Sequence, residues 1–197
     1  SNSNRPEKAS KLAMQLLSQM ESISRQTIYD LQFSLSAELG EDYFGAATTF
    51  VAAEIDQITR KAKILSVGDS RAYLIDAQGK WQQITQDHSI LSELLSDFPD
   101  KKEEDFATIY GGVSSCLVAD YSEFQDKIFY QEIEIQQGES LLLCSDGLTD
   151  GLLEEMREKI WKQYDNDKSR LTVCRKLITK QRFYDDLSVV ICTIIAT

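Results

Sequence analysis

The stretch Leu141-Leu142-Leu143-Cys144-Ser145-Asp146-Gly147-Leu148-Thr149-Asp150 decides how the rest of the chain is interpreted. Its first four residues are apolar at consecutive positions, which predicts a central strand over Leu141–Cys144 that is buried on both faces. Asp146 follows directly after that strand, and Asp150 lies four residues later, beside the start of an expected helix. We therefore ask whether other carboxylates occupy comparable positions.

Three further aspartates stand at the ends of predicted strands. Asp69 follows the predicted strand 62–67, and Asp185 and Asp186 immediately precede a predicted last strand, 187–195. Carboxylates at the ends of several buried strands can converge at one edge of a sheet, where a divalent cation removes their mutual repulsion. Two hard cations bridged by carboxylates and water hydrolyse phosphate esters, because they lower the pKa of water and neutralise the phosphoryl oxygens.

Each of these aspartates also has an ordinary structural interpretation. Asp146 before a glycine is typical of a turn, and Asp69 is compatible with a hairpin tip. Asp150 suits the N-cap of a helix that starts at Gly151, and the pair Asp185–Asp186 suits the solubilisation of an edge strand. Taken singly the four signals are weak, and their value lies in the combination.

Composition limits the classes of function. The 197 residues correspond to one domain, and 21 basic against 32 acidic residues give a net charge of −11. That charge argues against nucleic acid and anionic membranes as partners, and suits hard divalent cations. The single histidine, His88, argues against a His-rich metal site. The four cysteines have no zinc-site spacing, and Cys144 and Cys192 are expected to be small core residues of a protein in a reducing cytoplasm.

The periodicity of the remaining chain predicts an α+β fold. Helices are expected at residues 6–22, 24–39, 89–98, 152–164 and 171–180. Strands are expected at residues 46–55, 62–67, 72–75, 81–84, 128–135, 141–144 and 187–195. Hairpin turns are expected at Gly79 and Gly138. Strand hairpins in the middle of the chain favour layered antiparallel sheets over an alternating parallel fold.

Four segments resemble, in order and rough spacing, metal-dependent serine/threonine phosphatases of the PP2C (PPM) type. The segments are Gly68-Asp69-Ser70-Arg71-Ala72, Ile84-Thr85-Gln86-Asp87-His88-Ser89, Leu143-Cys144-Ser145-Asp146-Gly147-Leu148-Thr149-Asp150 and Asp185-Asp186-Leu187-Ser188-Val189-Val190. The resemblance covers residues 45–195 and implies a single PP2C-like domain over 1–197. It also implies an α-β-β-α sandwich of antiparallel sheets flanked by helices, with a binuclear Mn²⁺ or Mg²⁺ centre at one end.

The resemblance also implies roles for individual residues. Asp146 and Asp185 match ligands of the binuclear centre, and Asp69 and Asp150 match positions that hold an additional, weaker metal together with Asp146. Two or three Mn²⁺ or Mg²⁺ ions are therefore expected. His88 matches a structural position, and we interpret it as a hydrogen-bonded residue and not as a general acid.

The chain departs from the family pattern at its start. The family's Glu-Asp pair and its Asp-Gly-x-Gly-Gly motif, which supplies a bridging aspartate, have no match here, and residues 7–13 resemble the helix that follows that motif. Three explanations stay open. The chain is a fragment that lacks about 40–60 residues and its N-terminal strands, or a member that has lost catalysis, or a chain whose missing strands come from another molecule. The fragment is the favoured expectation.

The leading hypothesis is a metal-dependent protein serine/threonine phosphatase that hydrolyses phosphoesters by metal-activated water. Its partner is a phosphoprotein substrate, and the net charge favours a neutral or basic phosphopeptide. We expect a cytoplasmic protein with no nucleic-acid or membrane partner. The alternatives are a catalytically inactive PP2C-like scaffold that binds a signalling partner, and a purely structural divalent-cation site. The oligomeric state stays open.

Overall fold

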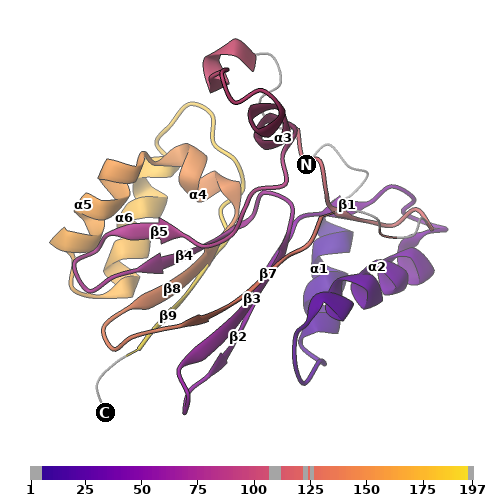
Figure 1. Ribbon diagram of the computed structural model, residues 1–197, viewed down its shortest axis with the longest axis horizontal. Helices are drawn as coiled ribbons and strands as arrows, with labels where there is room; N and C mark the ends of the chain where they lie inside the picture. Colours follow the sequence, from indigo (N-terminus) through magenta and orange to yellow (C-terminus); the bar gives the residue numbers. More distant parts are fainter. Residues whose placement is uncertain (1–5, 107–111, 122–123, 125–126, 195–197) are drawn as a thin grey trace. The chain divides into compact units, whose positions relative to one another are not determined.

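The computed structural model describes residues 6–106, 112–121, 124 and 127–194 (Figure 1). The chain divides into two compact units, which are described separately. Unit 1 comprises residues 1–54, 63–69 and 87–131, and unit 2 comprises residues 55–62, 70–86 and 132–197. Within the described residues, no helix has the length and apolar character that a membrane crossing requires.

Unit 1 contains the N-terminal helix pair α1 (Pro6–Leu17) and α2 (Arg25–Leu39). Its core holds apolar side chains of both helices together with those of neighbouring strands. The predicted first helix ends at Leu17 instead of residue 22, because the chain beyond it turns to place the Ile23 N–H on Glu54 Oε2 at 2.8 Å. Further along, α3 (Ile90–Asp97) agrees with prediction, and a 3₁₀ turn, η1 (Glu103–Phe106), ends the charged segment that follows it.

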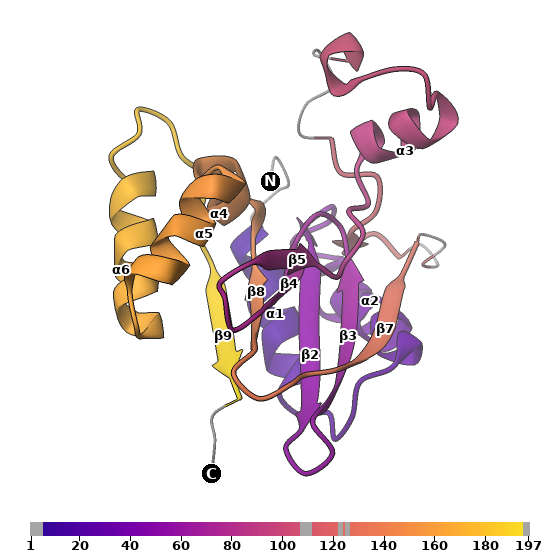
Figure 2. The ribbon, with the colours of Figure 1, turned by 60° about the vertical axis from the view of Figure 1, so that its left-hand side comes forward.

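The strands centred on unit 1 form two small antiparallel groups. The predicted strand 46–55 is divided into β1 (Ala47–Thr48) and β2 (Phe50–Asp56), and β1 pairs with β6 (Leu117–Val118). In the other group the strand order is β2-β3-β7, where β3 is Lys61–Val67 and β7 is Phe129–Glu134 (Figure 2).

Unit 2 is built on a four-stranded antiparallel sheet. Its strand order is β5-β4-β8-β9, with bounds Trp81–Gln83, Arg71–Ile75, Ser140–Cys144 and Val189–Thr193. The strand β8 pairs with β4 on one side and β9 on the other, which confirms the predicted central strand. The predicted turns are also confirmed, since Gly79 and Gly138 both adopt positive φ, at 79° and 86°.

Three helices cover one face of this sheet, namely α4 (Asp146–Gly151), α5 (Glu154–Gln163) and α6 (Asp167–Ile178). Their apolar side chains share a core with those of the strands. The short helix α4 was not predicted, and it places Asp150 inside a helix, so the N-cap interpretation of Asp150 is wrong.

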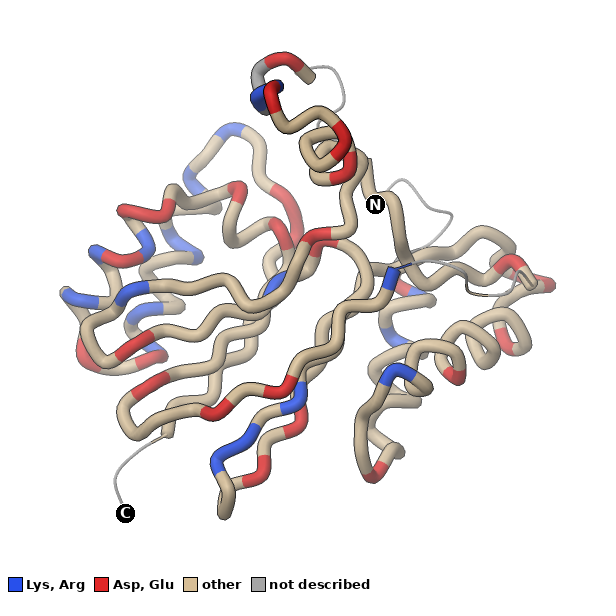
Figure 3. Tube along the Cα trace, viewed as in Figure 1, with Lys and Arg blue, Asp and Glu red and all other residues tan. Residues whose placement is uncertain are grey.

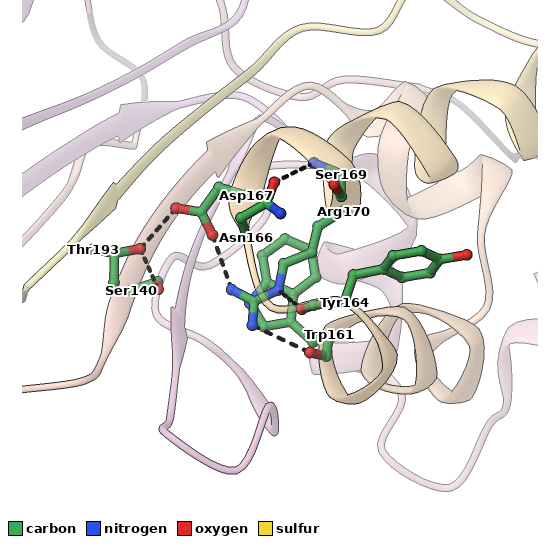
Figure 4. A network of polar contacts seen from close by, with 8 residues as sticks. All are labelled: Ser140, Trp161, Tyr164, Asn166, Asp167, Ser169, Arg170 and Thr193. Atoms are coloured by element: carbon green, nitrogen blue, oxygen red, sulfur yellow. Dashed lines mark hydrogen bonds and ion pairs between the residues drawn. The ribbon is translucent and has the colours of Figure 1, made fainter.

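A polar network ties α6 to the end of the sheet at which β8 begins (Figure 4). The Thr193 hydroxyl donates to Asp167 Oδ2 at 3.0 Å and lies 2.7 Å from the Ser140 hydroxyl. Arg170 Nη1 donates to Asp167 Oδ1 at 2.9 Å. The network holds β9 in register with β8, since Ser140 and Thr193 are direct cross-strand partners.

The two cysteines expected in the core differ from each other. Cys144 is buried, as predicted, but Cys192 is exposed, so the prediction for Cys192 is wrong. Alternate residues of a strand point to opposite faces, and in β9 Val189 and Ile191 pack on the helical core while Val190 is 65% exposed.

The described part of the last predicted strand ends at Thr193, and residue 195 lies outside the described residues. The mixture of helices and antiparallel sheets confirms the predicted α+β class, while the single-domain interpretation stays a prediction.

Candidate metal centre

The corner between β8 and α4 brings two acidic segments of unit 2 together. Ser145, between the strand and the helix, donates from its hydroxyl to the Asp186 carbonyl at 2.9 Å and accepts from the Ser188 N–H at 3.0 Å. Its own N–H donates to the Ser188 carbonyl at 3.0 Å. These three bonds, which we call the Ser145 clamp, fix the chain that leads into β9 against the end of β8. Asp146 and Asp185 are thereby placed on neighbouring segments.

Gly147 is required by the close approach of these two segments. A Cβ atom at this position would collide with the Asp186 carbonyl oxygen and lie 3.2 Å from the Asp185 carbonyl oxygen. The Asp-Gly pair is therefore more than a turn, because glycine allows the second acidic segment to pass directly against the start of α4.

The electrostatic setting of Asp146 is unfavourable for its negative charge. Burial raises the pKa of this half-buried carboxyl, and the charges of Asp185 and then Asp150 raise it further. The largest opposing effect is a hydrogen bond from the Gly147 N–H to Asp146 Oδ1, at 2.9 Å. Three carboxylates thus repel one another at the start of α4, and a cation would relieve that repulsion.

The other predicted ligands have different surroundings. Asp185 is exposed and accepts from the Asp186 N–H through Oδ1 at 2.7 Å, and Asp150 is exposed one helical turn after Asp146. Asp69 is half-buried and belongs to unit 1. In the part of the chain that the structure describes, no three His, Cys, Asp or Glu residues are grouped so as to hold a metal ion. Within unit 2 the charges of Asp185 and Asp150 act on Asp146, and metal binding by the four aspartates together stays a prediction.

His88 occupies a structural position in unit 1. Its Nδ1 accepts from the Gly68 N–H at 3.2 Å, and its backbone N–H donates to the Gly68 carbonyl at 2.9 Å. Gly68 has a φ of 100°, and a Cβ there would lie 2.5 Å from Thr49 Cγ2. The buried imidazole therefore fixes the turn that carries Asp69, which confirms that His88 is a hydrogen-bonded residue.

The residues of unit 2 fit a divalent cation in chemical type. Mg²⁺ and Mn²⁺ prefer oxygen ligands. Asp146 is a carboxylate whose pKa is raised, and the carboxylates of Asp185 and Asp150 act on it. Sequence reasoning missed Ser145 and the second role of Gly147. The available signal was a serine and a glycine on either side of the aspartate, but such residues are common at strand ends and identify no partner.

Comparison with known proteins places this arrangement in a family. The family model described as Protein phosphatase 2C matches residues 2–173, a range that includes Asp69, Asp146 and Asp150 and ends before Asp185. The serine/threonine phosphatase stp of Listeria monocytogenes is 33% identical over 194 residues, covering 89% of this chain and 73% of the Listeria protein. The chain belongs to the protein phosphatase 2C family of metal-dependent serine/threonine phosphatases.

Solved structures agree with that assignment at the level of the fold. The structure of the Mycobacterium tuberculosis serine/threonine phosphatase PstP/Ppp has a TM-score of 0.81 at 21% identity, with 96% of this chain and 83% of that chain covered. A structure of the PstP catalytic domain in complex with two manganese ions has a TM-score of 0.76 at 21% identity, covering 96% and 82% of the two chains.

Proposed function

We propose that the chain dephosphorylates phosphoserine and phosphothreonine in proteins at the corner between β8 and α4, with Asp146 and Asp185 as ligands of the catalytic metal ions. The observation that supports this assignment most directly is the Ser145 clamp, which brings Asp146, a carboxylate whose pKa is raised, beside the segment of Asp185. Asp150 and Asp69 are proposed as ligands of an additional ion.

The chain's own residues prepare this corner for a cation. The Gly147 N–H orients one oxygen of Asp146, and the Asp186 N–H orients one oxygen of Asp185. Both carboxylates keep their remaining lone pairs for further ligands. Divalent ions held there would supply positive charge to the phosphoryl oxygens and lower the pKa of water.

The identity and number of the ions are part of the proposal. We propose two or three Mn²⁺ or Mg²⁺ ions, supported by the carboxylate ligand type and by the two manganese ions of the PstP structure. The net charge of −11 favours a neutral or basic phosphopeptide as substrate. A cytoplasmic location is proposed on the composition, and the four free cysteines are compatible with it.

The test combines a turnover measurement with a direct measurement of metal binding. Phosphate release from a phosphothreonine peptide is measured with Mn²⁺, with and without EDTA, for the 197-residue chain and for the complete reading frame that contains it. Calorimetric titration with Mn²⁺ is run on the same proteins. Asp146→Ala is expected to lower turnover by orders of magnitude and to weaken Mn²⁺ binding, because it removes a ligand. Asp165→Ala, which changes an exposed aspartate elsewhere in unit 2, is the matched control.

Undiminished turnover in Asp146→Ala would refute the assignment of the site. If neither form of the protein releases phosphate or binds Mn²⁺, the scaffold alternative replaces the phosphatase. If chelation lowers the melting temperature but turnover never depends on metal, the site is a structural one.

A further inference from the structure

The outer side of α2 in unit 1 presents an unusual row of apolar side chains. Tyr29, Phe33 and Ala37 follow one another at intervals of four residues and so lie on one face of the helix. Tyr29 is 44% exposed and Phe33 is 75% exposed. The opposite side of α2 carries Ile28, Leu31 and Leu35, which are buried in the core of the unit. The helix is therefore apolar on two sides, and core packing explains one of them.

This row forms one wall of a groove of about 500 Å³, and Tyr121 and Phe124 lie on the other wall. The Tyr29 and Phe124 rings meet edge to face, with centroids 5.9 Å apart. A groove of this size with aromatic walls is typical of a site that binds apolar groups.

Specific contacts hold the two walls together before any partner arrives. The Gln32 side chain donates to the Val118 carbonyl at 2.6 Å and accepts from the Val118 N–H at 2.9 Å. Gly40, at the end of α2, has no Cβ, and one placed there would collide with the Tyr121 ring. Because the groove is already formed, binding does not require ordering of its walls.

One polar atom in the groove lacks a partner within the described chain. Ser36 lines the groove at 6% exposure, and its hydroxyl oxygen is buried without a hydrogen bond. A buried hydroxyl without a hydrogen bond is costly, whereas the buried amide of Gln32 on the same helix is bonded to the Val118 backbone. Ser36 therefore offers a hydrogen bond to a polar group that enters the groove.

The surface around the groove is acidic. Among the described residues that line it none is charged, but Asp30 and Glu38 lie beside the apolar row on α2, and Asp120 precedes Tyr121. Between Gln26 and Thr59 the sequence contains no lysine or arginine. Figure 3 shows acidic positions along α2. The first residue of the helix, Arg25, is basic. An occupant with apolar side chains and positive charge complements this surface.

We propose that this groove docks a basic amphipathic segment of a partner protein. Its apolar side chains lie between the α2 row and Tyr121, and its Lys and Arg side chains face Asp30 and Glu38. A polar group of the segment pairs with the Ser36 hydroxyl. A membrane surface is disfavoured, because the acidic rim would repel anionic lipid headgroups.

The test measures binding of a fluorescently labelled amphipathic helix made of Leu, Phe and Lys to the full chain without metal, by fluorescence anisotropy. Phe33→Ser is expected to weaken binding at least about tenfold, because it removes a central aromatic anchor. The double variant Asp30→Lys/Glu38→Lys is expected to weaken binding and to reduce its dependence on salt. Met156→Ser, at an exposed apolar position of α5, is the control and should bind like the parent.

A peptide of the same composition with its apolar residues scattered separates docking from attraction to net charge. Equal binding of this peptide, or unchanged binding by Phe33→Ser, overturns the proposal. Binding to phosphatidylcholine vesicles that Phe33→Ser abolishes would assign the surface to a membrane instead. Since the readout is binding without metal, failure here is distinct from failure of the phosphatase assignment.

Discussion

Two carboxylates in the molecule have opposite surroundings. Glu54 of unit 1 accepts from the Ser22 hydroxyl at 2.7 Å, the Ile23 N–H at 2.8 Å and Lys63 Nζ at 3.0 Å. These hydrogen bonds lower the pKa of Glu54 to about 2, and the bond from Ser22 has the largest effect. Asp146 of unit 2 has one backbone donor and two acidic neighbours, and its pKa is raised, mainly by burial.

This difference in surroundings distinguishes a structural carboxylate, Glu54, from a carboxylate that is suited to binding a cation, Asp146. Glu54 has its donors within the chain, so it holds the turn after α1 in place. Among the described residues Asp146 has a single such donor, the Gly147 N–H, and the fold keeps it beside other acids through the Ser145 clamp. An unfavourable charge that persists in a fold points to function, because a purely structural position gains nothing from it.

The variant with the largest expected effect tests whether the Asp185 segment must lie directly against the start of α4. Gly147→Ala places a methyl group against the Asp186 carbonyl and is expected to displace the Asp185 segment. We expect turnover to fall about a hundredfold, since small displacements at a reacting centre have effects of that order. Destabilisation of about 1–3 kcal/mol is expected from overpacking, and urea unfolding measures it.

The control for Gly147→Ala is Gly138→Ala. Gly138 has a φ of 86° in a turn, and a Cβ there would lie 3.5 Å from the Ala77 Cβ, an ordinary contact. This variant carries backbone strain of about 1 kcal/mol away from the β8–α4 corner and should keep full turnover. An equal loss of turnover in both variants would show that general destabilisation, and not the site, explains the effect.

The next largest effect is a change in melting temperature, which should have opposite signs when Asp146 and Glu54 are neutralised. Without metal, Asp146→Asn should raise the melting temperature, because it removes a repelled charge, and Glu54→Gln should lower it, because it weakens the bonds to Ser22 and Lys63. A shift of about 2–4 °C in each direction corresponds to about 1 kcal/mol in a chain of this size. Differential scanning calorimetry measures both, and shifts of the same sign would contradict the comparison.

The dependence of these two effects on pH follows from the directions of the pKa shifts. Asp146 binds its proton more tightly in the folded state, so metal-free stability increases as pH falls through its raised pKa toward the ordinary value of 3.8. The advantage of Asp146→Asn should therefore shrink on acidification. Glu54 stabilises the fold above its ordinary pKa of 4.5, and this contribution is lost as pH falls toward about 2. Melting temperatures across this range check both trends.

A smaller effect is expected at the Ser145 clamp. Ser145→Ala removes the hydroxyl that bridges Asp186 and Ser188, which should cost about 1 kcal/mol and lower turnover less than Gly147→Ala does. Thr179→Ala removes an exposed hydroxyl bonded to the Arg175 carbonyl and is expected to stay within about 0.5 kcal/mol of the parent. If Ser145→Ala matches Thr179→Ala in both stability and turnover, the clamp does not position the site.

The smallest expected effect is a change in stability at two uncharged residues, Cys192 and Cys144, which differ in burial. Cys192→Ser, at an exposed position of β9, should change stability by less than about 0.5 kcal/mol. Cys144→Ser should cost about 1–3 kcal/mol, because it places a hydroxyl in the core of unit 2. Urea unfolding of the two variants provides the measurement, and equal stabilities would contradict the assignment of Cys192 to the surface.

Local patterns in the sequence predicted most helices and strands, but contacts between distant residues decided the exceptions. The first helix ends early because Glu54, 31 residues away, binds the Ile23 N–H. The helix α4 contains two glycines, which are poor helix formers, so its sequence gave no helical signal. The exposure of Cys192 depends on which face of β9 the helices cover, and the apolar run at 187–195, which is apolar at both alternating sets of positions, does not indicate that face.

The candidate site was predicted in part for the same reason. The order of the motifs indicated that Asp146 and Asp185 belong together, and their electrostatic interaction in unit 2 is consistent with it. The hydrogen bonds of Ser145 and the close approach at Gly147 were not predictable, because both depend on a chain segment about 40 residues further along. The predicted participation of Asp69 stays a prediction.

The Ser145 clamp also has a consequence for the order of folding. Its partners lie 41 and 43 residues further along the chain, whereas the β4–β5 hairpin joins residues separated by a short turn. Contacts between distant residues form later than local ones, because a longer loop must close first. On the ribosome, Asp146 emerges well before Asp185, so β8 and its neighbouring hairpin are made before the acidic corner exists. Assembly of the candidate metal centre thus coincides with docking of the last strand, and metal affinity should appear late in folding.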